Sequence, residues 1–155
     1  MRMRIGLHRG ECIVGNMGGS NRFDYTAIGD NVNLAARLER VNNVYGTEIL
    51  VSEAVAKAVG ATSALRPVDT VRVKGKKNAV DIFTPCDDPA LIEKTVAALE
   101  VYRRGEWTLA MARWQALCDA YPDDPVAKVF LARLRAWSER GWPDPWDGIT
   151  ELDSK

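Results

Sequence analysis

Two prolines and two aspartates between Thr84 and Pro89 divide this 155-residue chain into two unlike parts. Such a stretch interrupts any regular helix or strand. Most of the glycines lie before it, where 12 Lys and Arg face 8 Asp and Glu. All five tryptophans lie after it, where 9 basic residues face 13 acidic ones. The zero net charge therefore hides two units, and we expect them to span residues 1–86 and 87–155.

The first unit has short elements of both kinds. Apolar runs at Met3–His8 and Glu11–Met17, joined by Arg9 and Gly10, predict a β-hairpin. Asp30 stands where a helix cap would, and the apolar spacing after it predicts a helix that ends near Gly46. Further predicted elements are a strand at 48–51, a helix at 52–59 capped by Ser52, and strands at 70–73 and 79–83. This alternation predicts an α/β or α+β fold.

The second unit is predicted to be helical, with long periodic segments at 91–104, 108–121 and 125–140. Five positions have the spacing of one tetratricopeptide-type helical hairpin: Gly105, Trp107, Ala110, Trp114 and Pro122. One such repeat cannot bury its own apolar face, so we expect it to pack on the first unit or on a second chain. The stretch from Gly141 to Trp146 cannot continue a helix, and its tryptophans are expected to fold back.

Composition excludes several classes of protein. No apolar run approaches the roughly 18 residues of a membrane span, and the first residues lack the apolar core of a signal peptide. The three cysteines (Cys12, Cys86 and Cys118) are scattered, as in a cytoplasmic protein with reduced thiols rather than a disulfide or zinc protein. The single histidine, His8, is expected to be structural. The small basic excess lacks interleaved aromatic residues, which argues against nucleic-acid binding.

The richest candidate for a functional site is residues 22–37, RFDYTAIGDNVNLAAR. Asn33 and Arg37 are four residues apart, so they share one side of the predicted helix within its first two turns. Free N–H groups and the helix dipole favour an anion there, and a guanidinium matches phosphate oxygens. The pair therefore suits a ribose-phosphate ligand. The alternative is an exposed polar pair without function.

The segment FDYTAIGDNVNLAARLE resembles the signature of class III nucleotide cyclases, the adenylate and guanylate cyclases. The flanking segments RIGLHRGECIVGNMG, YGTEILVSEAV and VRVKGKKNAVDIF are similar to that family too, in the same order, over roughly residues 3–84. The resemblance implies an α+β fold: the C-terminal part of a ferredoxin-like cyclase catalytic domain, followed by the helical tail.

By this resemblance, Asn33 orients the ribose and Arg37 stabilises the pentavalent transition state at the α-phosphate. Thr26 occupies the position that reads the purine edge together with a lysine elsewhere. A threonine there is typical of bacterial adenylate cyclases and favours ATP over GTP. Lys74 or Lys76 would neutralise the triphosphate, and the sequence does not distinguish them. An exposed charged turn is the alternative for these lysines.

The family's reaction is an attack of the ribose 3′-oxygen on the α-phosphorus, which expels pyrophosphate and leaves a cyclic 3′,5′-monophosphate. Two Mg²⁺ or Mn²⁺ ions assist it, held by two aspartates on early strands. In the family, both aspartates and the purine-reading lysine precede the segment that begins here at Arg4. The metal ligands are therefore not expected in this chain. Asp24, expected in a loop, and Asp30, expected as a cap, are not expected to bind metal.

Class III sites form across a head-to-tail dimer, so the expected partners are ATP and a second copy or an intact cyclase subunit. The missing early strands would also leave an unpaired sheet edge, which invites pairing with another chain. Alone, the chain is expected to be nearly inactive. The preceding part of the protein would connect to a sensory or membrane region. The rival hypothesis is a non-catalytic interaction module whose helical tail binds a partner protein.

Overall fold

The computed structural model describes residues 3–19, 22–73 and 77–152, and the chain has an α+β fold. Its first part contains three strands, a long helix and a further set of short elements. These are β1 (Ile5–Leu7), β2 (Ile13–Gly19), β3 (Arg22–Ile28), α1 (Asp30–Tyr45), β4 (Ile49–Ser52), α2 (Glu53–Val59), a 3₁₀ turn (Gly60–Thr62), β5 (Leu65–Val73) and β6 (Ala79–Pro85). Its second part contains α3 (Pro89–Arg103), α4 (Trp107–Ala120), α5 (Pro125–Arg140) and β7 (Thr150–Leu152).

Five strands form a mixed sheet in the order β1-β4-β6-β5-β7. The outer pairs β1–β4 and β5–β7 are parallel, whereas β6 runs antiparallel to both of its neighbours. Gly6 of β1 lies directly under α1, because a Cβ atom there would collide with backbone atoms of Ala35 and Glu39. A side chain is therefore excluded at the point where this helix crosses the sheet.

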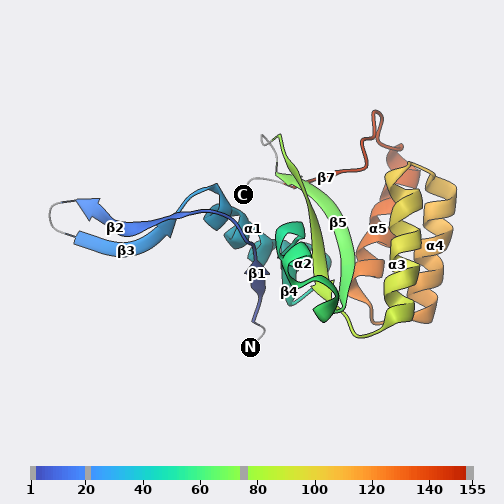
Figure 1. Ribbon diagram of the computed structural model, residues 1–155. Helices are drawn as coiled ribbons and strands as arrows, with labels where there is room; N and C mark the ends of the chain where they lie inside the picture. The colour runs from blue at the N-terminus through green and yellow to red at the C-terminus, as the bar shows by residue number, and fades with distance from the viewer. Residues whose placement is uncertain (1–2, 20–21, 74–76, 153–155) are drawn as a thin grey trace.

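The predicted hairpin between Met3–His8 and Glu11–Met17 is wrong. Strand β1 pairs with β4, with Gly6 opposite Leu50, while β2 pairs with β3 and Gly15 lies opposite Thr26. Local pairing is the simplest inference from two adjacent apolar runs, but the parallel partner of β1 lies more than 40 residues further along the chain. The β2–β3 hairpin projects from the body of the molecule (Figure 1). Asp24 therefore lies in strand β3 and not in a loop.

The three C-terminal helices pack against each other and, through α3 and α5, against the first part of the chain. In Figure 1 they stand beside β5, with α1 and α2 toward its other side. Helix α3 contacts β5, α4 contacts both α3 and α5, and α5 also reaches α1. Buried residues of both parts form one hydrophobic cluster, in which Leu38 of α1 and Val68 of β5 join Trp114 and Phe130 of the helices. The helical part therefore buries its apolar surface on the first part of the chain.

Buried charge also crosses this boundary. The guanidinium of Arg66 on β5 forms two hydrogen bonds with Asp124, at 2.5 and 2.8 Å, and a third with Thr95 at 2.8 Å. The two charged side chains are only 4% and 8% exposed. Asp124 also caps α5, since its carboxylate accepts the backbone N–H of Ala127. One aspartate thus begins a helix and fixes that helix to the sheet.

The C-terminal segment folds back over the helices, as the proline and tryptophan pattern predicts. The indole N–H of Trp146 donates to the backbone carbonyl of Tyr102 at 3.1 Å, and its ring packs against Trp107 and Trp137. Trp142 stacks on Trp107. Strand β7 then extends the sheet, which the sequence did not predict. Within the described residues, no helix is long and apolar enough to cross a membrane.

Candidate functional site

The N-terminal end of α1 follows directly on strand β3. Gly29 makes the turn between them with a φ of 142°, a conformation that residues with side chains rarely adopt. The first i→i−4 bond of the helix runs from the backbone N–H of Asn33 to the carbonyl of Gly29, at 3.1 Å. The backbone N–H groups before Asn33 therefore have no partner within the helix, and they make this end of α1 electropositive.

Asn33 and Arg37 project from these first turns at helical spacing. Asn33 is exposed and Arg37 is half-buried. Neither side chain forms a hydrogen bond or an ion pair with another residue of the described chain. The adjoining stripe of the helix holds it in place, since Leu38, Val41 and Tyr45 are buried in the core. The amide and the guanidinium are thus held on a fixed helix with their polar atoms available to a ligand.

The remaining residues of the predicted site are not brought against this pair. Thr26 lies exposed on β3 of the projecting hairpin, opposite Gly15 and four residues before the helix begins. No hydrogen bond joins Thr26 to Asn33 or Arg37 among the described residues. Lys74 and Lys76 lie outside the described residues.

A group that sequence reasoning did not find holds the start of α1 in place. Asn31 donates from its amide nitrogen to the carbonyl of Glu11 at 2.7 Å, so its Oδ1 atom is left to accept. That oxygen lies 2.9 Å from Nε2 of His8, and Nδ1 of the same ring lies 2.8 Å from the hydroxyl of Ser52. Because the Asn31 oxygen can only accept, Nε2 of His8 is the donor in that hydrogen bond. Gly10 permits this arrangement, because a Cβ there would collide with the Asn31 side chain.

His8 is thereby a structural histidine that ties together the ends of β1 and β4 and the beginning of α1. Ser52 does precede α2, as predicted, but its side chain makes no cap hydrogen bond to that helix. Its hydroxyl is used by His8 instead. No local sequence pattern could reveal this group, because its residues come from separate elements of the chain.

The acidic residues near α1 do not make a metal site. Asp24 is an exposed residue of the hairpin, and Asp30 is the first residue of the helix rather than its cap, which is Gly29. The described ranges contain no group of three or more His, Cys, Asp or Glu side chains that could hold a metal ion. The described residues therefore do not fit the two-ion site that the sequence resemblance implies. What they supply is an amide, a guanidinium and backbone N–H groups, which suit a phosphorylated sugar.

Comparison with known proteins points in one direction. The family model described as "Adenylate and Guanylate cyclase catalytic domain" matches residues 1–84. Adenylate cyclase 1 of Rhizobium meliloti is 44% identical over 82 residues, which is 53% of this chain and 12% of that protein. The adenylate cyclase of Anabaena cylindrica is 42% identical over 82 residues, covering 51% of this chain and 16% of the relative.

A third relative reaches into the helical part. The terminal-differentiation-specific adenylate cyclase of Dictyostelium discoideum is 30% identical over 141 residues, 83% of this chain and 7% of its own length. This chain thus spans only 7–16% of the length of these relatives. Among solved structures, the adenylyl cyclase CyaB from P. aeruginosa is 36% identical with a TM-score of 0.47, and the match covers 55% of this chain and 42% of CyaB.

Proposed function

Because this chain belongs to the adenylate and guanylate cyclase catalytic domain family, we propose that it supplies the ribose- and phosphate-contacting half of an adenylate cyclase site. The observation that carries the proposal is the pair Asn33 and Arg37, which projects from the electropositive end of α1 without side-chain partners in the described chain. The reaction converts ATP to 3′,5′-cyclic AMP and pyrophosphate.

Each of the two side chains has one task in this reaction. The ribose 3′-oxygen attacks the α-phosphorus, a new P–O bond forms, and the bond to the pyrophosphate oxygen breaks. The amide of Asn33 holds the ribose so that the 3′-oxygen faces the phosphorus. Negative charge grows on the α-phosphate oxygens as the fifth bond forms, and the guanidinium of Arg37 stabilises it. A preorganised donor of this kind contributes about 3 kcal/mol to transition-state stabilisation.

Substrate choice and the triphosphate involve the other predicted residues. Thr26 is exposed on β3, which leads directly into α1, and a short hydroxyl side chain can bond to the edge of a purine. We assign it to adenine rather than guanine. Lys74 or Lys76 binds the triphosphate tail, and this assignment rests on sequence alone.

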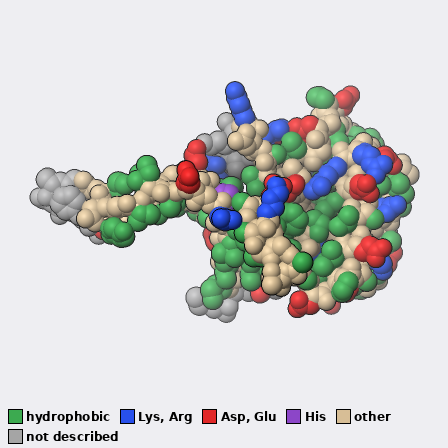
Figure 2. Space-filling view, in the orientation of Figure 1, with side chains coloured by type: hydrophobic (Ala, Val, Ile, Leu, Met, Phe, Trp, Pro, Cys, Tyr) green, Lys and Arg blue, Asp and Glu red, His purple; other side chains and the backbone are tan. Residues whose placement is uncertain are grey.

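The complete site requires a second subunit. The described residues contain no fitting metal site, so Mg²⁺ or Mn²⁺ would be held by the aspartates of an intact cyclase partner in a head-to-tail dimer. The projecting hairpin supports this, because it exposes apolar side chains on both faces: Ile13 (65%) and Ile28 (44%) on one, Val14 (53%) and Tyr25 (76%) on the other. Figure 2 shows hydrophobic side chains along it. An exposed apolar arm of this kind marks an interaction surface. Alone, or as a homodimer, the chain is nearly inactive.

We propose that the chain consists of two units: a partial cyclase domain at 1–86 and a tetratricopeptide-like tail at 87–155. The reaction belongs in the cytoplasm, where ATP is available. The second candidate function is a non-catalytic regulatory module that binds partners through this tail. The pair Asn33 and Arg37, which has no side-chain partners in the described chain, favours the catalytic role.

A complementation assay separates the two functions. The chain is mixed with an intact class III cyclase subunit in which the arginine equivalent to Arg37 is replaced by alanine. That subunit keeps its metal aspartates but cannot stabilise the transition state. With ATP and Mn²⁺, the mixture should form cyclic AMP well above either protein alone. A control subunit that also lacks its metal aspartates should stay inactive. A stable mixed dimer that makes no cyclic AMP would support the regulatory module instead.

A further inference from the structure

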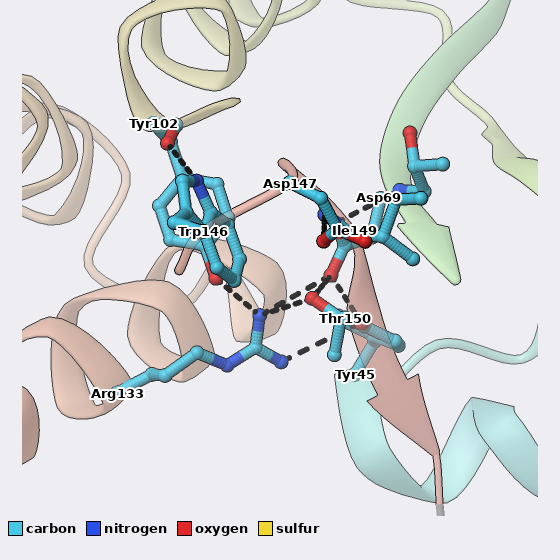
Figure 3. A network of polar contacts seen from close by, with 9 residues as sticks. Tyr45, Asp69, Tyr102, Arg133, Trp146, Asp147, Ile149 and Thr150 are labelled. Atoms are coloured by element: carbon cyan, nitrogen blue, oxygen red, sulfur yellow. Dashed lines mark hydrogen bonds and ion pairs between the residues drawn. The ribbon is translucent and has the colours of Figure 1, made fainter. Parts of the chain in front are cut away.

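The far end of α1 from the proposed site is embedded in a buried charged network. At its centre lies the carboxylate of Asp69 on β5, which is fully buried. Its Oδ2 atom accepts from the guanidinium of Arg133 on α5 at 3.2 Å and from the hydroxyl of Thr150 on β7 at 2.7 Å. Figure 3 shows these groups converging from separate elements.

Helix α1 joins this network through its last residue. The hydroxyl of Tyr45 donates to the same Oδ2 atom of Asp69 at 2.5 Å, and Arg133 approaches the Tyr45 oxygen at 3.5 Å. The Tyr45 ring is fully buried and packs against Phe130 of α5. Burial and the neighbouring carboxylate of Asp69 raise the pKa of Tyr45, so it stays a neutral donor.

The next residue tightens this contact. Gly46 ends α1 with a φ of 68°, and a Cβ built on it would lie 2.7 Å from the ring of Pro125. The end of α1 therefore lies directly against the first turn of α5. Helix α5 thus holds α1 by a packed ring, by a close backbone approach and through the Arg133–Asp69 ion pair.

The two ends of α1 belong to one continuous helix. Twelve residues separate Asn33 from Tyr45, about 18 Å along the helix axis. A tilt of a few degrees at the Tyr45 end therefore moves the other end by about 1 Å, and misplacement by 1 Å can lower a rate about 100-fold. The position of Arg37 thus depends on both anchors of α1, the Asn31–His8 contact at its start and Tyr45 at its end.

We propose that Tyr45 is a positioning residue for the cyclase site: its hydrogen bond to Asp69, the carboxylate that Arg133 pairs with, fixes the angle of α1, and with it Asn33 and Arg37. The helical part thereby forms part of the catalytic unit through Arg133. This inference rests on the proposed function. A purely structural network would affect only the stability of the fold.

Two single-atom deletions distinguish these roles. Tyr45→Phe removes the hydroxyl that ties α1 to the network and keeps the buried ring. Tyr102→Phe is the matched control, because its hydroxyl accepts from the same Arg133 atom at 3.0 Å but belongs to α3. Both should lower the melting temperature to a similar extent.

The first measurement is hydrogen exchange along α1 in the full chain, which needs no activity. In Tyr45→Phe, the amides of residues 34–45 should exchange about tenfold faster than in wild type, as expected for the loss of one buried hydrogen bond. In Tyr102→Phe they should exchange at the wild-type rate. Equal effects of the two variants on α1, or no effect of either, would overturn the proposal.

The second measurement uses the complemented mixture with ATP. Tyr45→Phe should lower kcat about tenfold with KM within twofold, because the lost alignment acts in the transition state, whereas Tyr102→Phe should keep kcat within twofold of wild type. Equal loss in both variants would show a structural role only. A wild-type mixture without activity would refute the proposed function, and hydrogen exchange would still decide whether the network holds α1.

Discussion

At the scale of single residues, Asp124 combines two roles that substitution can separate. It caps α5 and it neutralises the buried Arg66. Asp124→Ala should lower the free energy of unfolding by about 3–5 kcal/mol, because it leaves a guanidinium buried without its partner. Asp88→Ala is the matched control, since Asp88 caps α3 in the same way without a buried ion pair, and it should cost about 1 kcal/mol. Urea denaturation measures both, and equal losses would show that the ion pair adds nothing.

Tyr45 gives a second prediction, on pH. Its pKa is raised above the ordinary value of 10.0, first by burial and then by Asp69. Its stabilising contribution is fully present below pH 10 and is lost above it, because Tyr45 ionises in the unfolded chain but not in the folded one. The free energy of unfolding should thus fall above pH 10 by up to about 1.4 kcal/mol per pH unit from this residue.

Urea denaturation between pH 8.5 and 11 tests this slope. Tyr45→Phe should show a shallower decline than wild type. Tyr25→Phe is the control, because Tyr25 is 76% exposed on the hairpin, and its variant should follow the wild-type curve. An unchanged slope in Tyr45→Phe would contradict the prediction.

What the sequence revealed at this scale was limited to residues close together in the chain. Asn33 and Arg37 could be placed on one side of a helix because their spacing is local. The ion pairs Arg66–Asp124 and Asp69–Arg133 join residues about 60 positions apart. The local sequence around each of these residues does not indicate its partner. Buried ion pairs of this kind follow from the packing of elements, which the sequence pattern does not specify.

At the scale of elements, the crossing of β1 and α1 depends on Gly6. A Cβ there would collide with the helix backbone, so Gly6→Ala should force the two elements apart and cost about 1–3 kcal/mol. Gly15→Ala on β2 is the control, because a Cβ there meets no atom within 4 Å, and its effect should stay within about 0.5 kcal/mol. Chemical denaturation of the two variants measures the difference. A Gly6→Ala protein as stable as wild type would show that the helix can move away at no cost.

The helices and the later strands could be predicted from periodicity, since α3, α4 and α5 begin and end within a few residues of the expected positions. Strand pairing could not. The two apolar runs near the N-terminus suggest a local hairpin, whereas β1 pairs in parallel with the distant β4. Parallel pairing requires the intervening chain to cross over, here through the hairpin and α1, so adjacency in sequence is a poor guide to it.

At the scale of the whole molecule, the two parts of the chain share one hydrophobic cluster and two buried ion pairs. The composition break at Thr84 to Pro89 marks where the character of the chain changes, but it gives no sign of this shared core. The expectation that a single helical hairpin needs another surface to cover its apolar face agrees with the packing of α3 on β5 and of α5 on α1. Strand β7 adds a further contact, with ion pairs from Arg72 to Asp147 and Glu151.

In the proposed reaction, Arg37 acts on the transition state in a site shared with a second subunit. The most direct test is the kcat of the complemented mixture with Arg37→Ala, measured beside Arg40→Ala. Arg40 is an exposed arginine one turn further along α1 and serves as the matched control. We predict that Arg37→Ala lowers kcat about 100- to 1000-fold and that Arg40→Ala stays within twofold of wild type. Equal rates for the two variants would contradict the account.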